Sequence, residues 1–269
     1  GDRRQRQMCI RDRGNQTRKI RDLDHHVASD RADTAWLTEV RGQIDRTHRG
    51  QFAPEQIVKC VEAAVMSDDF DVGMSVEKAC FAECLNHPQR EALIHIFFAE
   101  RAANKIPGLA GDVPLMDIKE AAVVGAGTMG GGIAMCFANA GIPVKVYDNS
   151  PEGLERGVSV IRSNYARTVS KGRLSQSDMD DRMAKIEPVS TMEAFQNADV
   201  VVEAVYENLD LKKQIFETLD GIMKPGALLA TNTSGLDVDA IAASTSRPES
   251  VCGMHFFSPA NVMRLLEVV

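Results

Sequence analysis

The hydrophobic and polar positions of this sequence follow two different rhythms, and the change falls near residue 117. In the first part, apolar residues recur every three or four positions, which is the period of one helix face. This spacing predicts helices over 53–67, 76–86 and 86–105, whereas the rest of 21–74 is only weakly patterned. The segment "IPGLAGDVP" at 106–114 is typical of a linker. These helices have no strands to cover, so we expect this part to be a piece of a larger structure.

From residue 117, short apolar runs alternate with amphipathic stretches. The expected strands are 119–127, 142–148, 198–205, 226–234, 250–258 and 264–269. Helices are expected over 128–141, through the polar stretch 151–184, over 208–223 and near "DVDAIAAS". Strands that alternate with helices at this spacing indicate βαβ units. The predicted fold class is therefore α/β, with a doubly wound, mostly parallel sheet of the Rossmann type.

A glycine-rich turn joins the first of these strands to the first helix. Gly125, Gly127 and Gly130 fit the pattern G-x-G-x-x-G, and Asp148 ends the next predicted strand. The pattern alone is weak, but a preceding strand, a following helix and a later acid are the context that a dinucleotide-binding turn requires. In such a turn the first glycine permits the bend, the second lets a pyrophosphate approach the backbone, and the third lets the helix pack on the strand.

The same turn favours NAD as the ligand. The pyrophosphate is expected at the helix N-terminus, so Thr128 and Met129, which open that helix, are counted among the cofactor-binding residues. Asp148 can accept hydrogen bonds from the adenosine ribose hydroxyls and would repel the 2′-phosphate of NADP. Its neighbours Asn149 and Ser150 supply no arginine for that phosphate. The alternative is a glycine-rich turn without a ligand.

Composition narrows the class of protein. Hydrophobic residues make up 44% and charged residues 26% of the 269 residues, which is typical of a globular protein. The net charge of −7 gives no general reason to expect nucleic-acid binding, and no apolar run approaches the roughly 18 residues of a membrane span. The scattered cysteines form no C-x-x-C pair, which favours reduced thiols in an intracellular protein, and no metal site is expected.

The first twenty residues differ from the rest because they are strongly basic and almost without large apolar side chains. They show neither the apolar core nor the acid-free amphipathic pattern of a targeting peptide. A basic arm for nucleic acid is one interpretation. A disordered or non-native leader over 1–20 is the interpretation that we favour.

The final segment, "GMHFFSPANVMRLLEVV" at 253–269, raises a catalytic hypothesis. It places His255 at the end of one predicted strand and Glu267 on the next. Oxidising a secondary alcohol requires a base for the hydroxyl proton while hydride leaves the carbon, and histidine titrates in a suitable range. A carboxylate on the other ring nitrogen would fix the tautomer and stabilise the imidazolium. A histidine that only packs in the core is the alternative.

Four segments together carry a family resemblance: "VVGAGTMGGGIA", "VVEAVYENLDLKKQIF", "NTSGL" and the final segment. They resemble the NAD-binding domain of L-3-hydroxyacyl-CoA dehydrogenases, in the variety found in multifunctional fatty-acid β-oxidation enzymes such as the fatty-acid oxidation complex α subunit and the peroxisomal bifunctional enzyme. In those proteins a crotonase-fold enoyl-CoA hydratase domain precedes the dehydrogenase. The resemblance is specific over 119–269, moderate over 53–118 and absent over 1–20.

The resemblance implies a division of the chain and roles for three residues. Residues 21–116 would be a helical remnant of the hydratase domain plus a linker helix, and 117–269 the NAD-binding dehydrogenase domain. His255 and Glu267 match the catalytic dyad. Ser234 matches the residue that hydrogen-bonds the oxygen being oxidised, although a turn or capping serine is the alternative.

Three further residues match positions near the nicotinamide end of the cofactor. Asn232 matches a residue near the nicotinamide and the thioester, with a turn-forming asparagine as the alternative. Glu207 and Lys212 match residues that contact the cofactor, although Lys212 has the alternative of a solvated charge on a helix. Ser258 stands where many relatives have asparagine, so hydrogen bonding there is expected to differ.

The implied activity is the NAD-dependent oxidation of (3S)-3-hydroxyacyl-CoA to 3-oxoacyl-CoA. The family also uses a downstream all-helical domain, which supplies an asparagine, dimer contacts and much of the acyl-CoA cleft and which is expected to lie beyond residue 269. Weak or absent turnover is therefore expected of this chain alone, and hydratase activity is not expected. The parent is expected in a homodimer or a thiolase-containing complex, in the bacterial cytoplasm or else in a peroxisome or mitochondrion.

Two rival functions stay open at this point. One is a monofunctional 3-hydroxybutyryl-CoA dehydrogenase, against which the helical prefix argues. The other is a non-catalytic module that holds NAD or docks a partner, against which the paired His255 and Glu267 argue.

Overall fold

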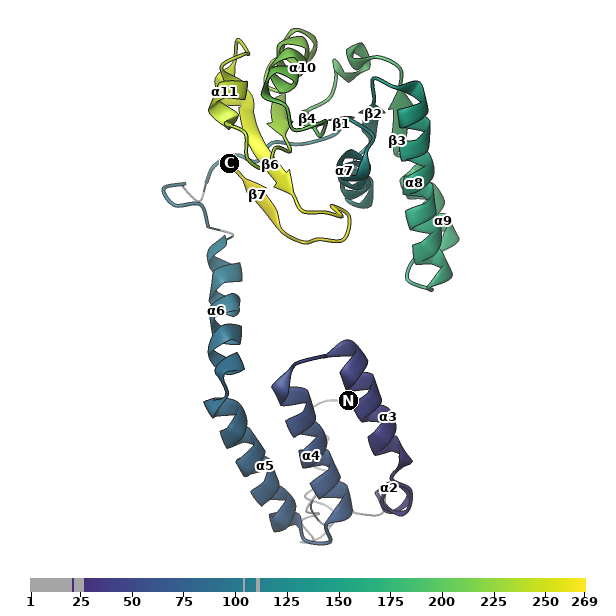
Figure 1. Cartoon of the computed structure of the whole chain (residues 1–269), viewed down its shortest axis with the longest axis vertical. Coiled ribbons are helices and arrows are strands. Elements are labelled where there is room, and N and C mark those ends of the chain that lie inside the picture. Colours follow the sequence, from purple (N-terminus) through teal and green to yellow (C-terminus); the bar gives the residue numbers. More distant parts are fainter. Residues whose placement is uncertain (1–20, 22–26, 104, 110–111) are drawn as a thin grey trace, which may run out of the picture. The chain divides into compact units, whose positions relative to one another are not determined.

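The computed structural model describes residues 21, 27–103, 105–109 and 112–269, so the predicted leader at 1–20 lies outside the described residues. The chain divides between Val113 and Pro114 into two compact units (Figure 1). The assignment of 21–116 to a hydratase remnant stays a prediction.

The first unit is helical. Its described helices are α2 (Ala28–Ala32), α3 (Ala35–Thr47), α4 (Phe52–Met66), α5 (Phe70–Asn86) and α6 (Pro88–Ala103). The three helices predicted in this region are present, and α5 begins earlier than its sequence pattern indicated. Few described side chains of the unit are buried, and α6 buries none of its own. The unit therefore has only a small core of its own.

The second unit is built on a seven-stranded sheet. Its strands are β1 (Ala121–Val124), β2 (Val144–Tyr147), β3 (Ile186–Val189), β4 (Val200–Glu203), β5 (Leu228–Thr231), β6 (Val251–Phe256) and β7 (Leu266–Val268). They lie in the order β3-β2-β1-β4-β5-β6-β7, and every neighbouring pair is parallel except β6 and β7. The parallel part has the strand order of a dinucleotide-binding fold, which confirms the predicted fold class.

The connections of this unit are mostly helices. They are α7 (Thr128–Asn139), α8 (Pro151–Ser170), α9 (Gln176–Met183), α10 (Leu209–Ile222) and α11 (Val238–Ala242), with short 3₁₀ helices η2 (Met192–Phe195) and η3 (Pro248–Ser250). Several begin at a side-chain cap: Ser150 caps α8 and Asn208 caps α10, each by accepting a backbone N–H three residues on. None of the helices in the described part of the chain is long and apolar enough to cross a membrane.

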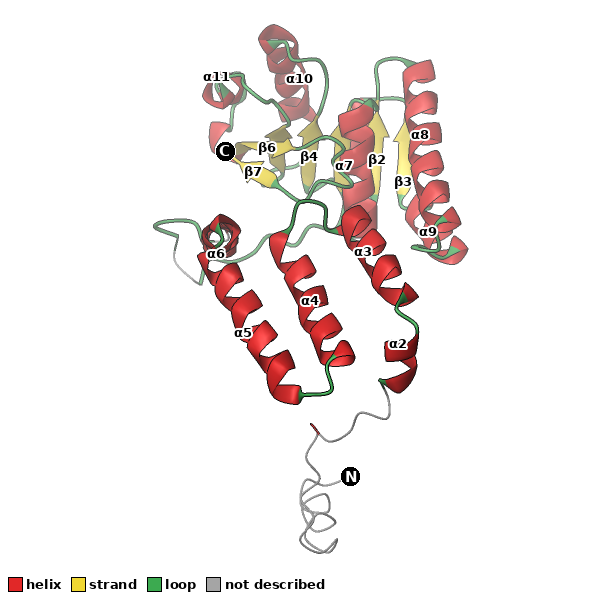
Figure 2. Ribbon diagram, turned by 60° about the horizontal axis from the view of Figure 1, so that its bottom comes forward, coloured by secondary structure: helices red, strands yellow, loops and turns green. Residues whose placement is uncertain are grey.

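Helices cover both faces of the sheet (Figures 1 and 2). Successive residues of β1 point to opposite faces, and all four are buried. Ala121 and Val123 belong to a core shared with α7, α8 and α9. Ala122 and Val124 belong to a second core, shared with η2, α10 and α11. This sandwich fixes the carboxyl ends of β1, β4 and β5 at one edge, where the site described below is found.

Two features differ from the prediction. The stretch 151–184 is two helices rather than one, because the chain turns at Gly172, whose φ is +66°. Strand β3 was not predicted at all. It contains Pro188, which cannot donate to a ladder, and it is tolerated because β3 is the edge strand and pairs only with β2.

Candidate functional site

The glycine turn after β1 is shaped by close backbone contacts. Gly125 has a φ of +99°, and a Cβ there would lie 2.7 Å from the Ala204 carbonyl oxygen. A Cβ on Gly130 would lie 1.8 Å from the Gly125 carbonyl oxygen, so any side chain would force α7 away from the strand. A Cβ on Gly127 meets nothing within 4 Å, which leaves its backbone open to a ligand. The bend at Gly125 and the close packing at Gly130 agree with the motif, whereas the pyrophosphate contact at Gly127 stays a prediction.

A fourth glycine, Gly157, was missed by the motif. It lies on α8, and a Cβ there would be 2.3 Å from the Ala126 carbonyl oxygen. The second helix of the fold therefore closes directly on the glycine turn. The sequence signal was a glycine inside a polar helix that also contains Gly153, and a glycine there usually marks a close approach or a weak helix.

Asp148 lies between this turn and the start of α8. Its carboxylate accepts the Ala126 N–H at 2.8 Å and the Ser150 N–H at 3.0 Å. The residue therefore holds the glycine turn in place, a role that the sequence did not predict. Asp148 also lines a pocket of about 450 Å³ between β2, β3 and α8, whose other lining residues include Tyr147, Leu154, Val158 and Val189. Each carboxylate oxygen can accept a second hydrogen bond, so a ribose hydroxyl fits the predicted role.

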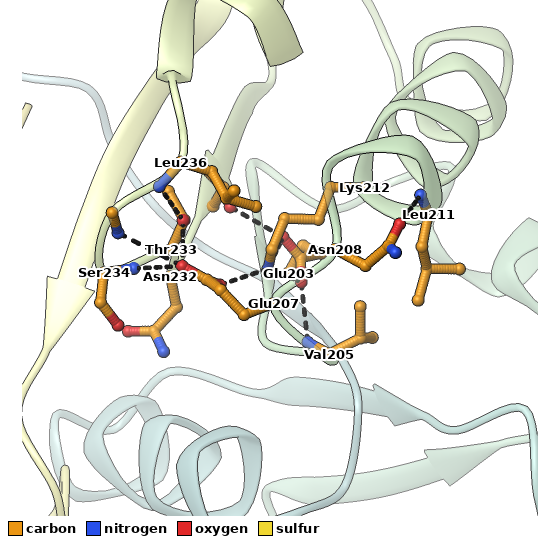
Figure 3. A network of polar contacts seen from close by, with 12 residues as sticks. Glu203, Val205, Glu207, Asn208, Leu211, Lys212, Asn232, Thr233, Ser234 and Leu236 are labelled. Atoms are coloured by element: carbon orange, nitrogen blue, oxygen red, sulfur yellow. Dashed lines mark hydrogen bonds and ion pairs between the residues drawn. The ribbon is translucent and has the colours of Figure 1, made fainter.

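A buried ion pair occupies the carboxyl ends of β4 and β5. Glu203, the last residue of β4, and Lys212 on α10 are both 0% exposed. The Lys212 Nζ donates to both Glu203 carboxylate oxygens, at 2.7 and 2.9 Å. The Val205 N–H and the Thr231 hydroxyl also donate to that carboxylate, each at 2.7 Å (Figure 3). The pair is thus fully enclosed and hydrogen-bonded, as a buried pair must be.

This burial excludes the alternative of a solvated helix charge for Lys212. It also leaves the side chain no exposed surface with which to touch a cofactor. In this structure its ammonium lies 3.5 Å from Glu207, whose side chain is half-exposed. The predicted contact of Lys212 with the cofactor would therefore be made through Glu207.

Glu207 organises the turn after β5. Its Oε1 accepts the Thr233 hydroxyl at 2.5 Å, the Ser234 N–H at 2.8 Å and the Gly235 N–H at 3.2 Å (Figure 3). Partial burial raises the pKa of Glu207, but these hydrogen bonds and the Lys212 charge outweigh it and hold the pKa below its ordinary value. The carboxylate therefore stays ionised and keeps the turn together. The Ser234 side chain is left exposed at the surface of the turn.

His255 and Glu267 face one another across the antiparallel pair β6 and β7. The His255 Nδ1 lies 2.8 Å from the Glu267 Oε2. Because a carboxylate can only accept, Nδ1 carries the proton, and Nε2 is left as the basic nitrogen. The side chain of His255 is 20% exposed and that of Glu267 is 52% exposed, so solvent or substrate can reach the pair.

Asn232 connects the turn after β5 to this pair. Its Oδ1 accepts the N–H of Phe256, the residue after His255, at 2.8 Å. That bond commits the amide oxygen and leaves the Asn232 NH₂ group to donate elsewhere. The predicted residues Asn232, His255 and Glu267, which come from the turn after β5 and from strands β6 and β7, thus lie close together.

The chain after β6 also contacts the helix of the glycine turn. Ala260 is buried, and a Cβ on Gly132 of α7 would lie 3.0 Å from the Ala260 Cβ. The Cys136 thiol donates to the Ala260 carbonyl at 3.3 Å. The segment between the histidine and the glutamate is therefore packed against the glycine-turn helix, which ties the two parts of the site together.

Within the described residues, no cluster of histidine, cysteine, aspartate or glutamate side chains is arranged to hold a metal ion. The arrangement is instead an open glycine turn, an acid at the end of β2 and a histidine–carboxylate pair at the same edge. These features define a dinucleotide-binding α/β domain with a candidate base. Residues 120–269 match the model of the family described as "3-hydroxyacyl-CoA dehydrogenase, NAD binding domain", and the chain belongs to that family.

Comparisons with individual proteins agree with this family assignment. The chain is 42% identical over 231 residues to the peroxisomal bifunctional enzyme of Cavia porcellus, which covers 84% of this chain and 32% of that protein. It is 43% identical over 154 residues to a probable 3-hydroxybutyryl-CoA dehydrogenase of Bacillus subtilis, which covers 57% of this chain and 54% of that one. The solved structure of 3-hydroxybutyryl-CoA dehydrogenase from Escherichia coli superposes with a TM-score of 0.56 at 40% identity, over 57% of this chain and 32% of that one. The chain thus spans about a third of the length of the bifunctional relative.

Proposed function

We propose that this chain forms the NAD-binding part of an enzyme that oxidises (3S)-3-hydroxyacyl-CoA to 3-oxoacyl-CoA. The observation that carries the proposal is the 2.8 Å contact between His255 Nδ1 and Glu267 Oε2, at the sheet edge that also presents the open glycine turn. A glycine turn alone would support only cofactor binding. A histidine oriented by a carboxylate adds the base that alcohol oxidation requires.

Each residue then has a defined task. The His255 Nε2 accepts the proton of the 3-hydroxyl group, and the Glu267 carboxylate stabilises the imidazolium that results. The Ser234 hydroxyl, exposed on its turn, donates to the same substrate oxygen. When bound, NAD⁺ supplies the acceptor for the hydride that leaves C3. Gly125, Gly127, Gly130 and the N-terminal residues Thr128 and Met129 of α7 would hold its pyrophosphate.

The surface beside the pair supports an acyl-CoA substrate whose site is completed elsewhere. Four apolar side chains near Glu267 are largely exposed: Val262, Met263, Leu265 and Val268. An apolar patch of this kind beside a base is suited to an acyl chain or to a covering domain. We propose that a downstream helical domain of the parent covers it, so that this chain alone turns over slowly because the substrate is poorly held.

Two parents are compatible with the site, and the helical unit separates them. The match to the peroxisomal bifunctional enzyme extends over 84% of the chain, whereas the match to the Bacillus subtilis protein covers 57%. The longer match supports a multifunctional β-oxidation enzyme as the parent. We place that parent inside the cell, in a bacterial cytoplasm, peroxisome or mitochondrion, as a homodimer or in a thiolase-containing complex.

The test is a side-by-side assay of this chain and of its parent protein with a (3S)-3-hydroxyacyl-CoA substrate and NAD⁺. We expect NADH to form rapidly with the parent and slowly with this chain, while both bind NADH with the same affinity. Hydration of a 2-enoyl-CoA by this chain is not expected. A parent that binds NADH but leaves the 3-hydroxyacyl-CoA unoxidised would refute the proposed reaction. Equal turnover by both would refute the role of the covering domain.

A further inference from the structure

The buried glutamate Glu203 was not identified as a site residue from the sequence, yet it lies at the centre of the polar network in Figure 3. It ends an otherwise apolar strand, and its side chain is completely enclosed. Three donor groups converge on its two oxygens: the Lys212 ammonium, which contacts both oxygens, the Val205 N–H and the Thr231 hydroxyl. Burying a carboxylate costs free energy of desolvation, and the ion pair and hydrogen bonds around Glu203 must offset that cost.

These polar contacts extend from the buried Glu203 to the exposed turn after β5. Glu203 holds the Lys212 ammonium, which lies 3.5 Å from the Glu207 carboxylate. Glu207 in turn accepts hydrogen bonds from the Thr233 hydroxyl and from the Ser234 and Gly235 backbone. Without Glu203, the ammonium would be a buried cation shared with a half-exposed carboxylate, and Glu207 would be drawn inward toward it. The position of the turn after β5 therefore depends on a residue that no ligand can reach.

We propose that Glu203 is a positioning residue for the nicotinamide end of the cofactor. It fixes Lys212, so that Glu207 and the 233–235 turn keep the geometry that the bound nicotinamide and the Ser234 hydroxyl require. This inference rests on the proposed function. It differs from a purely structural role, because it assigns the effect of Glu203 to one end of the cofactor only. Within the described residues, no side-chain hydrogen bond joins Asp148 or the glycine turn to this network. Gly125 packs on the backbone of Ala204 beside it, so the adenosine end should respond much less than the nicotinamide end.

Two ligands separate these roles. NADH carries the nicotinamide, whereas ADP-ribose keeps the adenosine and pyrophosphate and lacks it. In the variant Glu203→Gln, we expect the Kd for NADH to rise about three- to tenfold, which is less than the loss of a directly contacting charged hydrogen bond. The Kd for ADP-ribose should stay within a factor of two. Both are measured by isothermal titration calorimetry on this chain.

The matched control is Asp220→Asn. Asp220 also holds a basic partner from another segment: its Oδ1 accepts the Arg247 Nε–H at 2.7 Å, and it lies at the far end of α10 from Lys212. We expect this variant, like Glu203→Gln, to lose thermal stability but to leave both dissociation constants unchanged. Equal losses of NADH and ADP-ribose affinity in Glu203→Gln would show a structural role only and would overturn the proposal.

A second variant covers the case in which Glu203→Gln does not fold. Replacing both partners, Glu203→Gln with Lys212→Met, removes the unpaired buried cation, and such replacements of a buried pair are often tolerated. The double variant should show the same selective loss for NADH. Wild-type affinity for both ligands would overturn the inference while leaving the proposed function intact, whereas failure of the wild-type chain to bind NADH would refute the proposed function itself.

Discussion

The glycine turn after β1 and the turn after β5 would hold opposite ends of one cofactor, yet they are built by different means. The glycine turn is a backbone structure, in which the absence of side chains at Gly125 and Gly130 permits contacts that a Cβ would block. The turn after β5 is held by side chains, through Glu203, Lys212 and Glu207. The first kind of site is sensitive to volume, and the second is sensitive to charge. The two should therefore fail in different ways when they are altered.

The largest effect is expected at His255, which lies next to the turn after β5 because Asn232 of that turn accepts the Phe256 N–H. His255→Gln removes the base and should lower turnover of the parent enzyme by about 10²–10⁴-fold, the usual contribution of general base catalysis. The Kd for NADH should stay near the wild-type value, because no part of the glycine turn is altered. Stopped-flow measurement of NADH formation, together with a fluorescence titration, checks both statements. Near-normal turnover in this variant would mean that His255 is only a packing residue.

Glu267→Gln tests whether the carboxylate supports His255 as the base. It leaves the imidazole in place but removes the charge that stabilises its protonated form, so the loss of turnover should be smaller than in His255→Gln. The two losses should not add in the double variant, because the residues act as a unit. Additive losses measured in such a double-mutant cycle would show that the two side chains act separately.

Two substitutions in the glycine turn should impair NADH binding in different ways. Gly130→Ala places a Cβ 1.8 Å from a backbone oxygen, so the turn must shift, and we expect both a lower melting temperature and a loss of NADH affinity of at least about tenfold. Gly127→Ala meets nothing within 4 Å in the free protein, so its stability should be unchanged while NADH binding weakens. Calorimetric melting and titration of both variants give the comparison. A stability loss in Gly127→Ala as large as that in Gly130→Ala would contradict this reading of the turn.

Asp148→Ala tests a side chain that supports the glycine turn. Loss of charge-assisted hydrogen bonds to the ribose should weaken NADH binding by about ten- to a hundredfold. Part of that loss comes from the glycine turn, because Asp148 also accepts the Ala126 N–H. Asp148→Asn keeps an acceptor for that N–H and should lose less affinity than Asp148→Ala. Titration of the two variants in parallel separates the contributions, and an unchanged NADH affinity in Asp148→Ala would exclude a ribose contact.

The smallest effect is expected outside both ends of the site. Hydrogen bonding to Lys224 and to the N–H groups of Lys119 and Glu120 lowers the pKa of Asp199 to about 2 from its ordinary value of 3.8. A lowered folded-state pKa gives stability that is present above the unfolded-state pKa and is lost as the pH falls from about 4 toward about 2. Asp199→Asn should flatten the acid limb of a stability–pH curve and leave NADH affinity at neutral pH unchanged. An identical acid limb in the two proteins would contradict the pKa assignment.

The sequence predicted the two ends of the site unequally. The glycine turn was predicted because its function depends on residues that are close in sequence and whose type, glycine, has a local geometric meaning. The His255–Glu267 pair was predicted through the family resemblance, because the strand pattern alone left a packing histidine open; the antiparallel register of β6 and β7 places the two residues face to face. Lys212 and Glu207 were named through the same resemblance, but Glu203 was not, because its burial depends on Thr231 and Lys212, which come from a different strand and a helix. The available signal was a charged residue that ends a run of three valines.

For the fold too, elements with a local sequence pattern were predicted and elements that depend on tertiary contacts were missed. Strands that are buried on both faces, such as β1 and β4, are continuous apolar runs and were predicted. Strand β3 was missed because an edge strand with a proline and exposed residues carries no such run. The hydrogen bond from the Ala126 N–H to Asp148 was missed for a related reason, because it depends on the tertiary packing of the glycine turn, on which α8 closes at Gly157.

The most direct test of the account is a titration of this chain with NADH and with NADPH under the same conditions. A glycine turn open at Gly127 beside the Asp148 carboxylate predicts saturable binding of one NADH per chain. Because the 2′-phosphate of NADPH would face the Asp148 carboxylate, whose neighbours Asn149 and Ser150 are not basic, NADPH should bind at least about tenfold more weakly. Equal affinity for the two nucleotides, or no saturable binding of NADH, would contradict the account.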